Sequence, residues 1–191
     1  MIRTKAEWRQ FFRQQRQPLS AEDLDSISQA IRQQLVGIPE WPQVSCILTY
    51  KAFRQEVNLD PLVAAFPEKI WGIPRCLPDQ GLAWHHYHVQ DALQPNRWGI
   101  PEPLPTAPPL DPIQADWILV PALGCDRWGT RIGYGQGFYD RVLPPLAATR
   151  VAVVPAGCLV DGPLPRDPWD APVHRIVTER EIMVVEHGQR S

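Results

Sequence analysis

The sequence predicts an α/β fold with a mostly parallel β-sheet, preceded by a pair of helices. Short apolar runs typical of buried strands alternate with segments of helical periodicity, as in sheets built from strand-helix-strand units. The first 37 residues contain helical patterns only. At 191 residues the chain is long enough to bury a substantial core, and we expect residues 1–191 to form a single domain.

Two capping patterns predict the helical pair within residues 1–37. They are Thr4-x-x-Glu7 and Ser20-x-x-Asp23, in which each side chain can satisfy a free N–H group at the start of a helix. The apolar residues that follow fall on one face of each helix. They are Trp8, Phe11 and Phe12 in the first helix, and Leu24, Ile27, Ile31 and Leu35 in the second.

The first helix also carries a line of basic side chains. Lys5, Arg9, Arg13 and Arg16 recur at helical spacing and share roughly one side. A charged line of this kind is usually solvated surface, and the pattern alone favours that interpretation.

After residue 42 the periodicity changes to that of strands. Strands are predicted at residues 44–50, 69–73, 82–89, 117–120, 151–154, 176–178 and 182–185, and helices at residues 59–66 and 138–146. Residues 82–89 alternate in polarity, which predicts a strand in a more exposed pair. Seven prolines between Pro95 and Pro112 predict a long, stiff loop.

A glycine-rich loop after the strand at residues 117–120 is the most informative feature. Gly133, Gly135 and Gly137 precede the next predicted helix. Glycines let the backbone approach an anion, and the free N–H groups at a helix start favour negative charge. Arg131 adds a fork of donors for phosphate oxygens. The spacing matches neither common nucleotide fingerprint, and the glycines alone are equally consistent with a tight turn that binds nothing.

Acidic residues lie where a phosphate site needs them. Asp140 falls in the first turn of the predicted helix and could hold the counter-metal of a phosphate. Glu56 follows the first strand, at the edge where ligands collect in α/β sheets, although its residue type alone indicates an exposed loop acid. Asp167 and Asp170 lie in a proline-stiffened loop and, without context, are turn-forming aspartates.

Composition excludes several function classes. The net charge of −2 and the pI near 6.2 provide no broad electrostatic surface for nucleic acid. No apolar stretch is long enough to span a bilayer, and the N-terminus lacks the apolar run of a signal peptide. We therefore expect a cytoplasmic protein with no membrane partner, whose four cysteines are reduced thiols.

Histidines and tryptophans give weaker signals. His85, His86 and His88 suggest a metal, but no further ligand stands at a defining spacing, so a zinc site is disfavoured. Trp98, in the proline-rich loop, is the tryptophan best placed to stack on an aromatic ligand.

Several motifs occur in order along nearly the whole chain. They are Lys5-x-x-x-Arg9, Glu56, Ile73-Pro-Arg75, Trp98-Gly-Ile-Pro-Glu-Pro103 and Val120-Pro-x-x-x-x-Asp126-x-x-Gly129-x-Arg131-x-Gly133-x-Gly135-x-Gly137-x-Tyr139-Asp140. In this order they resemble the 5-formyltetrahydrofolate cyclo-ligase family, also called methenyltetrahydrofolate synthetases. The resemblance implies a three-layer, Rossmann-like α/β fold of the type shared by sugar-phosphate isomerases and CoA transferases.

The resemblance also implies an activity. Members of this family cyclise 5-formyltetrahydrofolate to 5,10-methenyltetrahydrofolate, with ATP and Mg²⁺ as cofactors and with release of ADP and phosphate. It implies a small-molecule substrate and no nucleic-acid partner, and we expect the protein to act as a monomer.

Carried over position by position, the resemblance assigns roles within this chain. ATP contacts are expected from Lys5, Arg9, Arg131, Ile132, Gly133, Tyr134, Gly135, Gln136, Gly137, Phe138 and Tyr139. Folate contacts are expected from Glu56, Trp98, Tyr134, Gly135, Gln136, Gly137 and Phe138. Magnesium ligands are expected at Asp140 and Asp170, and catalytic roles at Arg131, Glu56 and Tyr139.

Some positions depart from the family pattern. Gln136 stands where many relatives carry glycine or lysine, and Phe138 where tyrosine is usual. Gln136 supplies no cation, so Arg131 and Lys5 carry more of the phosphate charge. Two alternatives stay open: a sugar-phosphate isomerase or CoA transferase on a similar fold, and a non-catalytic protein that binds folate or nucleotide without turnover.

Overall fold

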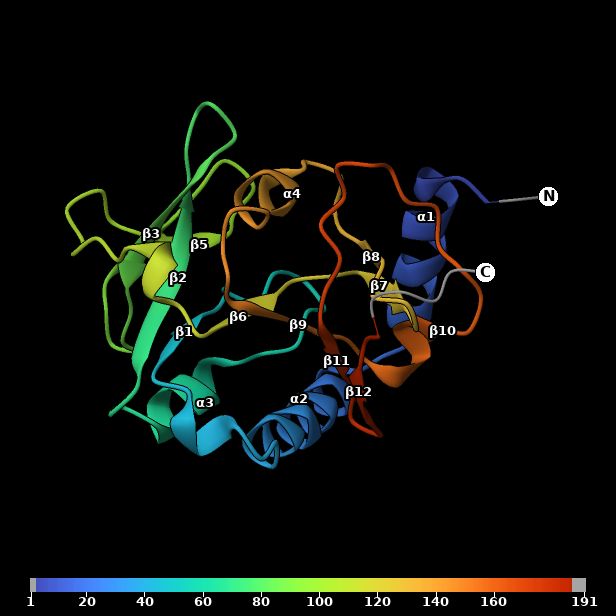
Figure 1. The fold of residues 1–191 in the computed structure, drawn as a ribbon, viewed down its shortest axis with the longest axis horizontal. Coiled ribbons are helices and arrows are strands. Elements are labelled where there is room, and N and C mark those ends of the chain that lie inside the picture. Colours follow the sequence, from blue (N-terminus) through green and yellow to red (C-terminus); the bar gives the residue numbers. More distant parts are fainter. Residues whose placement is uncertain (1–2, 187–191) are drawn as a thin grey trace.

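The computed structural model describes residues 3–186 and contains one large sheet, one small sheet and a two-stranded ribbon (Figure 1). The helices are α1 (Lys5–Arg16), α2 (Ala21–Val36), α3 (Asp60–Ala65) and α4 (Phe138–Val142), with short 3-10 turns η1 (Trp41–Gln43), η2 (Pro112–Gln114) and η3 (Ala156–Cys158). The large sheet contains β1 (Cys46–Leu48), β2 (Ile70–Cys76), β3 (Leu82–His86), β6 (Trp117–Val120), β9 (Thr149–Val153), β11 (Arg175–Val177) and β12 (Ile182–Val184). The small sheet contains β7 (Gly124–Asp126), β8 (Arg131–Ile132) and β10 (Leu159–Val160), and the ribbon contains β4 (Leu93–Pro95) and β5 (Pro101–Pro103).

The large sheet runs in the order β12-β11-β9-β6-β1-β2-β3. Its five inner strands pair in parallel, and the two edge strands, β3 and β12, pair antiparallel with their neighbours. The predicted α/β fold with a mostly parallel sheet is therefore confirmed. The strand predicted at residues 82–89 ends at His86, and it forms an edge of the main sheet.

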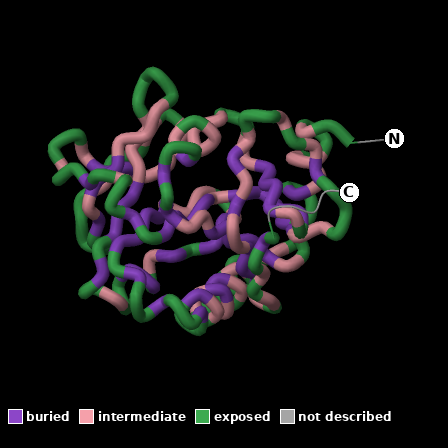
Figure 2. The backbone as a smooth tube through the Cα atoms, viewed as in Figure 1, coloured by how far each residue is buried: buried purple, intermediate pink, exposed green. Residues whose placement is uncertain are grey.

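Alternate side chains of the inner strands face two separate cores. On one face, Ile118 lies in a core that includes Phe12 of α1. On the other face, Leu119 lies in a core that includes Ile31 of α2 and Leu62 of α3. The sheet is thus the middle of three layers (Figure 1), and the buried parts of the chain concentrate along its strands (Figure 2).

Both predicted helix starts are capped as expected. Thr4 accepts a hydrogen bond from the N–H of Glu7, whose side chain accepts in turn from the Thr4 N–H. Ser20 and Asp23 form the same reciprocal pair before α2. These caps fix where α1 begins, and α1 carries the basic residues toward the site.

Two predicted segments differ in the structure. The helix predicted to reach residue 146 ends at Val142, because Pro144 and Pro145 follow closely and cannot continue a helix. The proline-rich segment is not one loop, since β5 and η2 begin within it and Pro95 pairs with Pro101 in the β4–β5 ribbon. Proline is tolerated there because a two-stranded ribbon has free edges that need no N–H donor.

The basic line on α1 is not simply solvated surface, so that interpretation is wrong. The Arg16 side chain is buried, with only 2% of the residue exposed. Its guanidinium donates to the carbonyl oxygens of Gln55, Ala122 and Leu123. Arg16 thereby ties α1 to the loops that follow β1 and β6.

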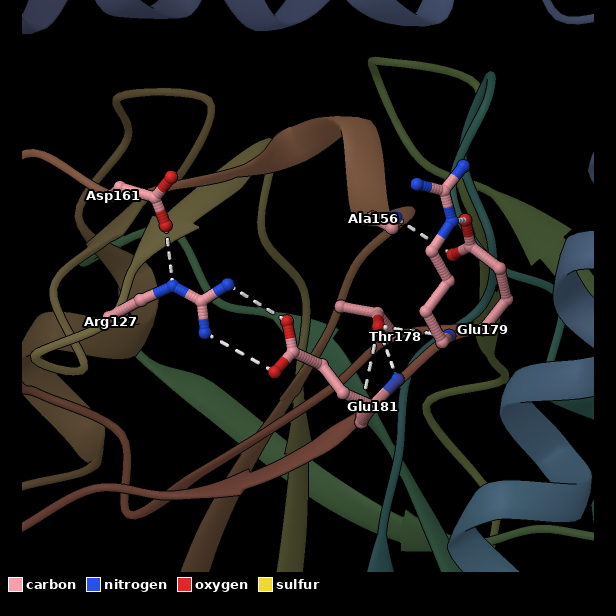
Figure 3. A network of polar contacts seen from close by, with 7 residues as sticks. Arg127, Ala156, Asp161, Thr178, Glu179 and Glu181 are labelled. Atoms are coloured by element: carbon pink, nitrogen blue, oxygen red, sulfur yellow. Dashed lines mark hydrogen bonds and ion pairs between the residues drawn. The ribbon is translucent and has the colours of Figure 1, made fainter.

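A polar network joins the small sheet to one end of the large sheet (Figure 3). Nε of Arg127, in the turn between β7 and β8, donates to Asp161 at 2.6 Å. Its two terminal nitrogens donate to the carboxylate of Glu181, in the turn between β11 and β12. These groups are largely exposed, so the network contributes little to stability.

Candidate active site

A cavity of about 570 Å³ lies where the inner strands of the large sheet end. This volume falls within the range of roughly 300–1,000 Å³ that is typical of small-molecule sites. Every residue that the sequence analysis assigned to the site lines it: Lys5, Arg9, Glu56, Trp98, Arg131, Ile132, Gly133, Tyr134, Gly135, Gln136, Gly137, Phe138, Tyr139, Asp140 and Asp170. The fold thus brings together α1, the loop after β1, the β4–β5 ribbon, the glycine loop and the loop at residues 165–172.

The glycine loop joins β8 to α4 and packs against α1. Gly135 and Gly137 adopt φ angles of 98° and 70°, which favour glycine. A Cβ atom on Gly135 would lie 3.1 Å from the guanidinium carbon of Arg9. Nε of Arg9 also donates to the carbonyl oxygen of Gly133 at 3.0 Å. The backbone conformation therefore favours glycine at position 135, and a side chain there would also displace the Arg9 guanidinium.

Arg131 lies in β8, just before this loop, and is buried. Its side chain is 6% exposed, and Nη2 donates to Oδ1 of Asp140 at 2.6 Å. Within residues 3–186, Nε of Arg131 and the hydroxyl of Tyr139 are buried without a hydrogen-bond partner. Burial raises the pKa of Tyr139, as does the charge of Glu56, so the phenol keeps its proton. Unpartnered buried donors are costly, and the oxygens of a phosphate would satisfy them.

Lys5 lies at the end of the cavity near the loop at residues 165–172. Its Nζ donates to Oδ2 of Asp170 at 2.5 Å and to Oδ2 of Asp167 at 2.7 Å. Burial lowers the pKa of Lys5, but the hydrogen bonds to Asp167 and Asp170 outweigh it and raise the pKa above its ordinary value. The ammonium group is therefore charged at neutral pH and available to an anionic ligand.

Asp140 and Asp170 form a donor set that fits Mg²⁺. Each uses one carboxylate oxygen in its ion pair, and the other accepts no hydrogen bond from the described part of the chain. Mg²⁺ is usually held by one or two carboxylates, together with waters and substrate phosphates. Between residues 3 and 186 no cluster of three or more metal-binding side chains occurs, so the pair suits a shared site rather than a closed one such as structural zinc.

Glu56 is a buried acid, and its assignment as an exposed loop residue on residue type alone is wrong. Only 5% of the residue is exposed. Burial raises its pKa to about 7, although the hydrogen bond from the Phe53 N–H and the charge of Arg16 act in the opposite direction. Glu56 can therefore exchange a proton near neutral pH.

Aromatic side chains form an apolar wall of the cavity. The rings of Trp98 and Phe138 meet edge to face, with their centroids 5.7 Å apart. Trp98 is held by Asn96, whose Oδ1 accepts from the Trp98 N–H at 2.9 Å, and Asn96 donates to the buried carboxylate of Glu102 at 2.6 Å. A flat aromatic ligand fits against such a wall.

Comparison with known proteins agrees with this geometry. The model of the 5-formyltetrahydrofolate cyclo-ligase family matches residues 1–179. The chain belongs to the 5-formyltetrahydrofolate cyclo-ligase family. A cyclo-ligase from Escherichia coli K12 is 26% identical over 181 residues, covering 89% of this chain and 97% of that protein. One from Mycolicibacterium smegmatis is 41% identical over 116 residues, covering 59% of this chain and 56% of that protein.

Solved structures lead to the same family. The NMR structure of Aquifex aeolicus 5,10-methenyltetrahydrofolate synthetase superposes with a TM-score of 0.85 at 29% identity, covering 98% of this chain and 95% of that one. A synthetase from Mycoplasma pneumoniae shares the fold, with a TM-score of 0.76 at 22% identity over 93% of this chain and 99% of that one. Membership of the cyclo-ligase family disfavours the isomerase and CoA-transferase alternatives.

Sequence reasoning missed part of this cyclo-ligase cavity. Tyr50, Phe53 and Arg54, which follow β1, and Cys76, which ends β2, also line it. The signal that selected Glu56, a position just after a strand, could have found the first three. The sequence does not reveal that Arg54 adopts a φ angle of 56°.

Across residues 3–186, no helix has the length and apolar character needed to cross a bilayer.

Proposed function

We propose that this chain catalyses the ATP-dependent cyclisation of 5-formyltetrahydrofolate to 5,10-methenyltetrahydrofolate, with release of ADP and phosphate. One observation carries the proposal beyond family membership. The glycine loop, its two cations Lys5 and Arg131, two carboxylates and the buried Glu56 all line one cavity with an aromatic wall. Phosphate-binding and ring-binding surfaces therefore share the same space.

The chemistry explains these residue types. A formamide oxygen is a poor leaving group, so it first takes the γ-phosphoryl group of ATP, and ADP departs. N10 of the folate then attacks the formyl carbon and loses its proton, and the C–O bond breaks to release phosphate, which takes up that proton. Negative charge at the transferring phosphoryl group must be stabilised, and Arg131, Lys5 and the loop N–H groups are placed to do so.

Asp140 and Asp170 would hold Mg²⁺ at the same end of the cavity. When bound there, Mg²⁺ supplies positive charge against the phosphates. Without it, the two carboxylates are neutralised by Arg131 and Lys5. With the carboxylates of Asp140 and Asp170 holding Mg²⁺, Lys5 and Arg131 would be free to pair with the phosphates.

Glu56 and the aromatic wall would bind the folate. We propose that Glu56 accepts a hydrogen bond from a folate N–H and thereby orients the formyl group. Trp98 and Phe138 would pack against the pterin ring, and the Tyr139 hydroxyl would donate to a phosphate oxygen. Phe138 supplies only packing, because it lacks the hydroxyl usual in the family.

We further propose a cytoplasmic monomer in which residues 1–191 form a single domain. The four cysteines are free thiols, as expected in a reducing compartment.

Absorbance at the methenyl-folate band tests the activity. Purified protein is mixed with 5-formyltetrahydrofolate and Mg-ATP, with a no-ATP control, Arg131→Ala and the matched surface variant Arg127→Ala. We expect ATP-dependent growth of the band, a loss of about 10²-fold or more in Arg131→Ala, and little change in Arg127→Ala. No growth despite folate or ATP binding would instead support the non-catalytic alternative.

A further inference from the structure

Basic side chains occur along the cavity, and most of them are already engaged. Lys5 pairs with Asp170, Lys51 with Asp60, and Arg131 with Asp140. The Arg9 guanidinium donates to a carbonyl oxygen of the glycine loop. Two cavity-lining guanidinium groups stand apart, because Arg13 and Arg54 make no hydrogen bond or ion pair through their side chains with the part of the chain that is described.

Arg13 lies away from the Lys5 end of the cavity, and Arg54 lies on the loop that follows β1. Arg13 is eight residues after Lys5 on α1, which places it about 12 Å further along the helix axis. Both guanidinium groups line the same cavity as Tyr134. Burial and the charge of Glu56 raise the pKa of Tyr134, and the charges of Arg16, Arg54 and Arg13 act against that rise. Arg13 and Arg54 are therefore two cavity cations that remain for a further anionic group.

Arg54 has an unusual backbone. Its φ angle is 56°, in the left-handed region that a residue with a side chain seldom adopts. Such conformations cost free energy and concentrate at ligand-binding positions. The guanidinium carbon lies 4.8 Å from the ring centroid of Phe53, and that ring meets Tyr134 edge to face at 5.9 Å. The strained loop thus presents a cation next to an aromatic pair.

We propose that Arg13 and Arg54 form a carboxylate-binding subsite for the glutamate end of the folate substrate. The inference rests on the proposed function, since it takes 5-formyltetrahydrofolate as the ligand. This substrate is a pterin joined through an aminobenzoyl group to glutamate, which carries two carboxylates. With the pterin against Trp98 and Phe138, the aminobenzoyl ring would lie against Phe53 and Tyr134. The glutamate carboxylates then reach guanidinium forks suited to bidentate recognition.

A truncated substrate distinguishes recognition of the glutamate carboxylates from other roles of Arg13 and Arg54. In this substrate the benzoyl group ends in a neutral primary amide in place of glutamate. The variants are Arg13→Gln, Arg54→Asn and their combination, and asparagine is chosen because it tolerates positive φ angles. Arg180→Gln is the matched control, because Arg180 is an exposed arginine outside the cavity.

We expect the double variant to raise the KM for 5-formyltetrahydrofolate about tenfold or more, because it loses both charge-assisted interactions with the glutamate carboxylates. The KM for the truncated amide, the KM for ATP and kcat should stay within about twofold of wild type, and Arg180→Gln should change nothing. Equal losses on both folates would overturn the subsite. A raised KM for ATP with an unchanged KM for folate would instead assign the arginines to phosphate.

Binding measurements keep this inference distinct from the proposed function. Quenching of tryptophan fluorescence gives the Kd of each folate without turnover. If wild-type protein forms no methenyl product, the proposed function fails. A double variant that still weakens binding of the full folate about tenfold, and not that of the amide, would support the subsite even then. Unchanged Kd values for both ligands would refute it.

Discussion

Arg131 and Asp140 close the glycine loop, with Nη2 of the arginine 2.6 Å from Oδ1 of the aspartate. The same carboxylate oxygen accepts from the N–H of Ala171 at 3.3 Å. Ala171 follows Asp170, so the phosphate loop and both expected magnesium ligands are mechanically connected. The position of one group in this unit therefore depends on the others.

Breaking this pair should reveal the coupling. Asp140→Asn leaves the buried Arg131 guanidinium without its counter-charge, and we expect the free energy of unfolding to fall by about 1–3 kcal/mol. Urea unfolding of wild type, Asp140→Asn, Arg131→Met and the double variant gives the coupling energy. We expect at least about 1 kcal/mol, because the two charges are close and the arginine is buried. Additive losses would mean that the two residues act independently.

Two neighbouring aspartates provide a matched test of the magnesium site. Asp167 and Asp170 both accept from Lys5, but only Asp170 lines the cavity. We expect Asp170→Asn to raise the Mg²⁺ concentration that gives half-maximal activity by about tenfold or more, and Asp167→Asn to change it far less. Chelation should abolish wild-type activity, and added Mg²⁺ should restore it. Equal shifts in the two variants would argue against Asp170 as a ligand.

Gly135→Ala should damage the phosphate loop. The φ angle of 98° and the contact with Arg9 disfavour any side chain, so we expect the free energy of unfolding to fall by about 1–2 kcal/mol and the KM for ATP to rise. Gly157→Ala is the control, because a Cβ atom there meets nothing within 4 Å. Thermal unfolding and initial rates measure both effects. Similar behaviour of the two variants would show that the loop tolerates a side chain.

Local signals in the sequence predicted much of this structure. The caps at Thr4 and Ser20 and the glycines of the loop are set by nearby backbone geometry, which spacing in the sequence reveals. The short strands β7, β8 and β10 were missed, because two or three residues are too few to establish a period. Local signals did not show that the site residues lie together, and only the family resemblance carried by the order of the motifs predicted it.

Burial of charged groups could not be predicted from the sequence. Arg16 reaches the carbonyl oxygens of Ala122 and Leu123, far along the chain, and only the tertiary fold brings them together. Glu56 likewise is buried in a loop that receives a hydrogen bond from Arg16 of α1 and packs Phe53 against Tyr134 of the glycine loop. Charged residues are usually exposed, so residue type predicts exposed side chains at both positions, where the structure has buried ones. The pKa of Glu56 is a consequence of that burial.

Glu56→Gln should therefore change how stability depends on pH. Burial raises the pKa of Glu56 from 4.5 to about 7, so the folded protein binds more protons than the unfolded chain between these values. The contribution to the free energy of unfolding is fully present below the lower value and is lost as pH rises through the upper one. The total loss is on the order of 3 kcal/mol, and the neutral glutamine should not show it.

Urea unfolding at about pH 5 and about pH 8 measures this difference. We expect Glu56→Gln to match wild type more closely at the lower pH and to be the more stable protein at the higher pH. The exposed acid Glu68 provides the control, because Glu68→Gln leaves a side chain that is in water in both states. In kinetics, Glu56→Gln should raise the KM for folate or lower kcat while the KM for ATP is unchanged. Parallel stability curves would mean that Glu56 does not titrate near neutral pH. An unchanged kcat/KM for folate would mean that Glu56 does not orient the substrate.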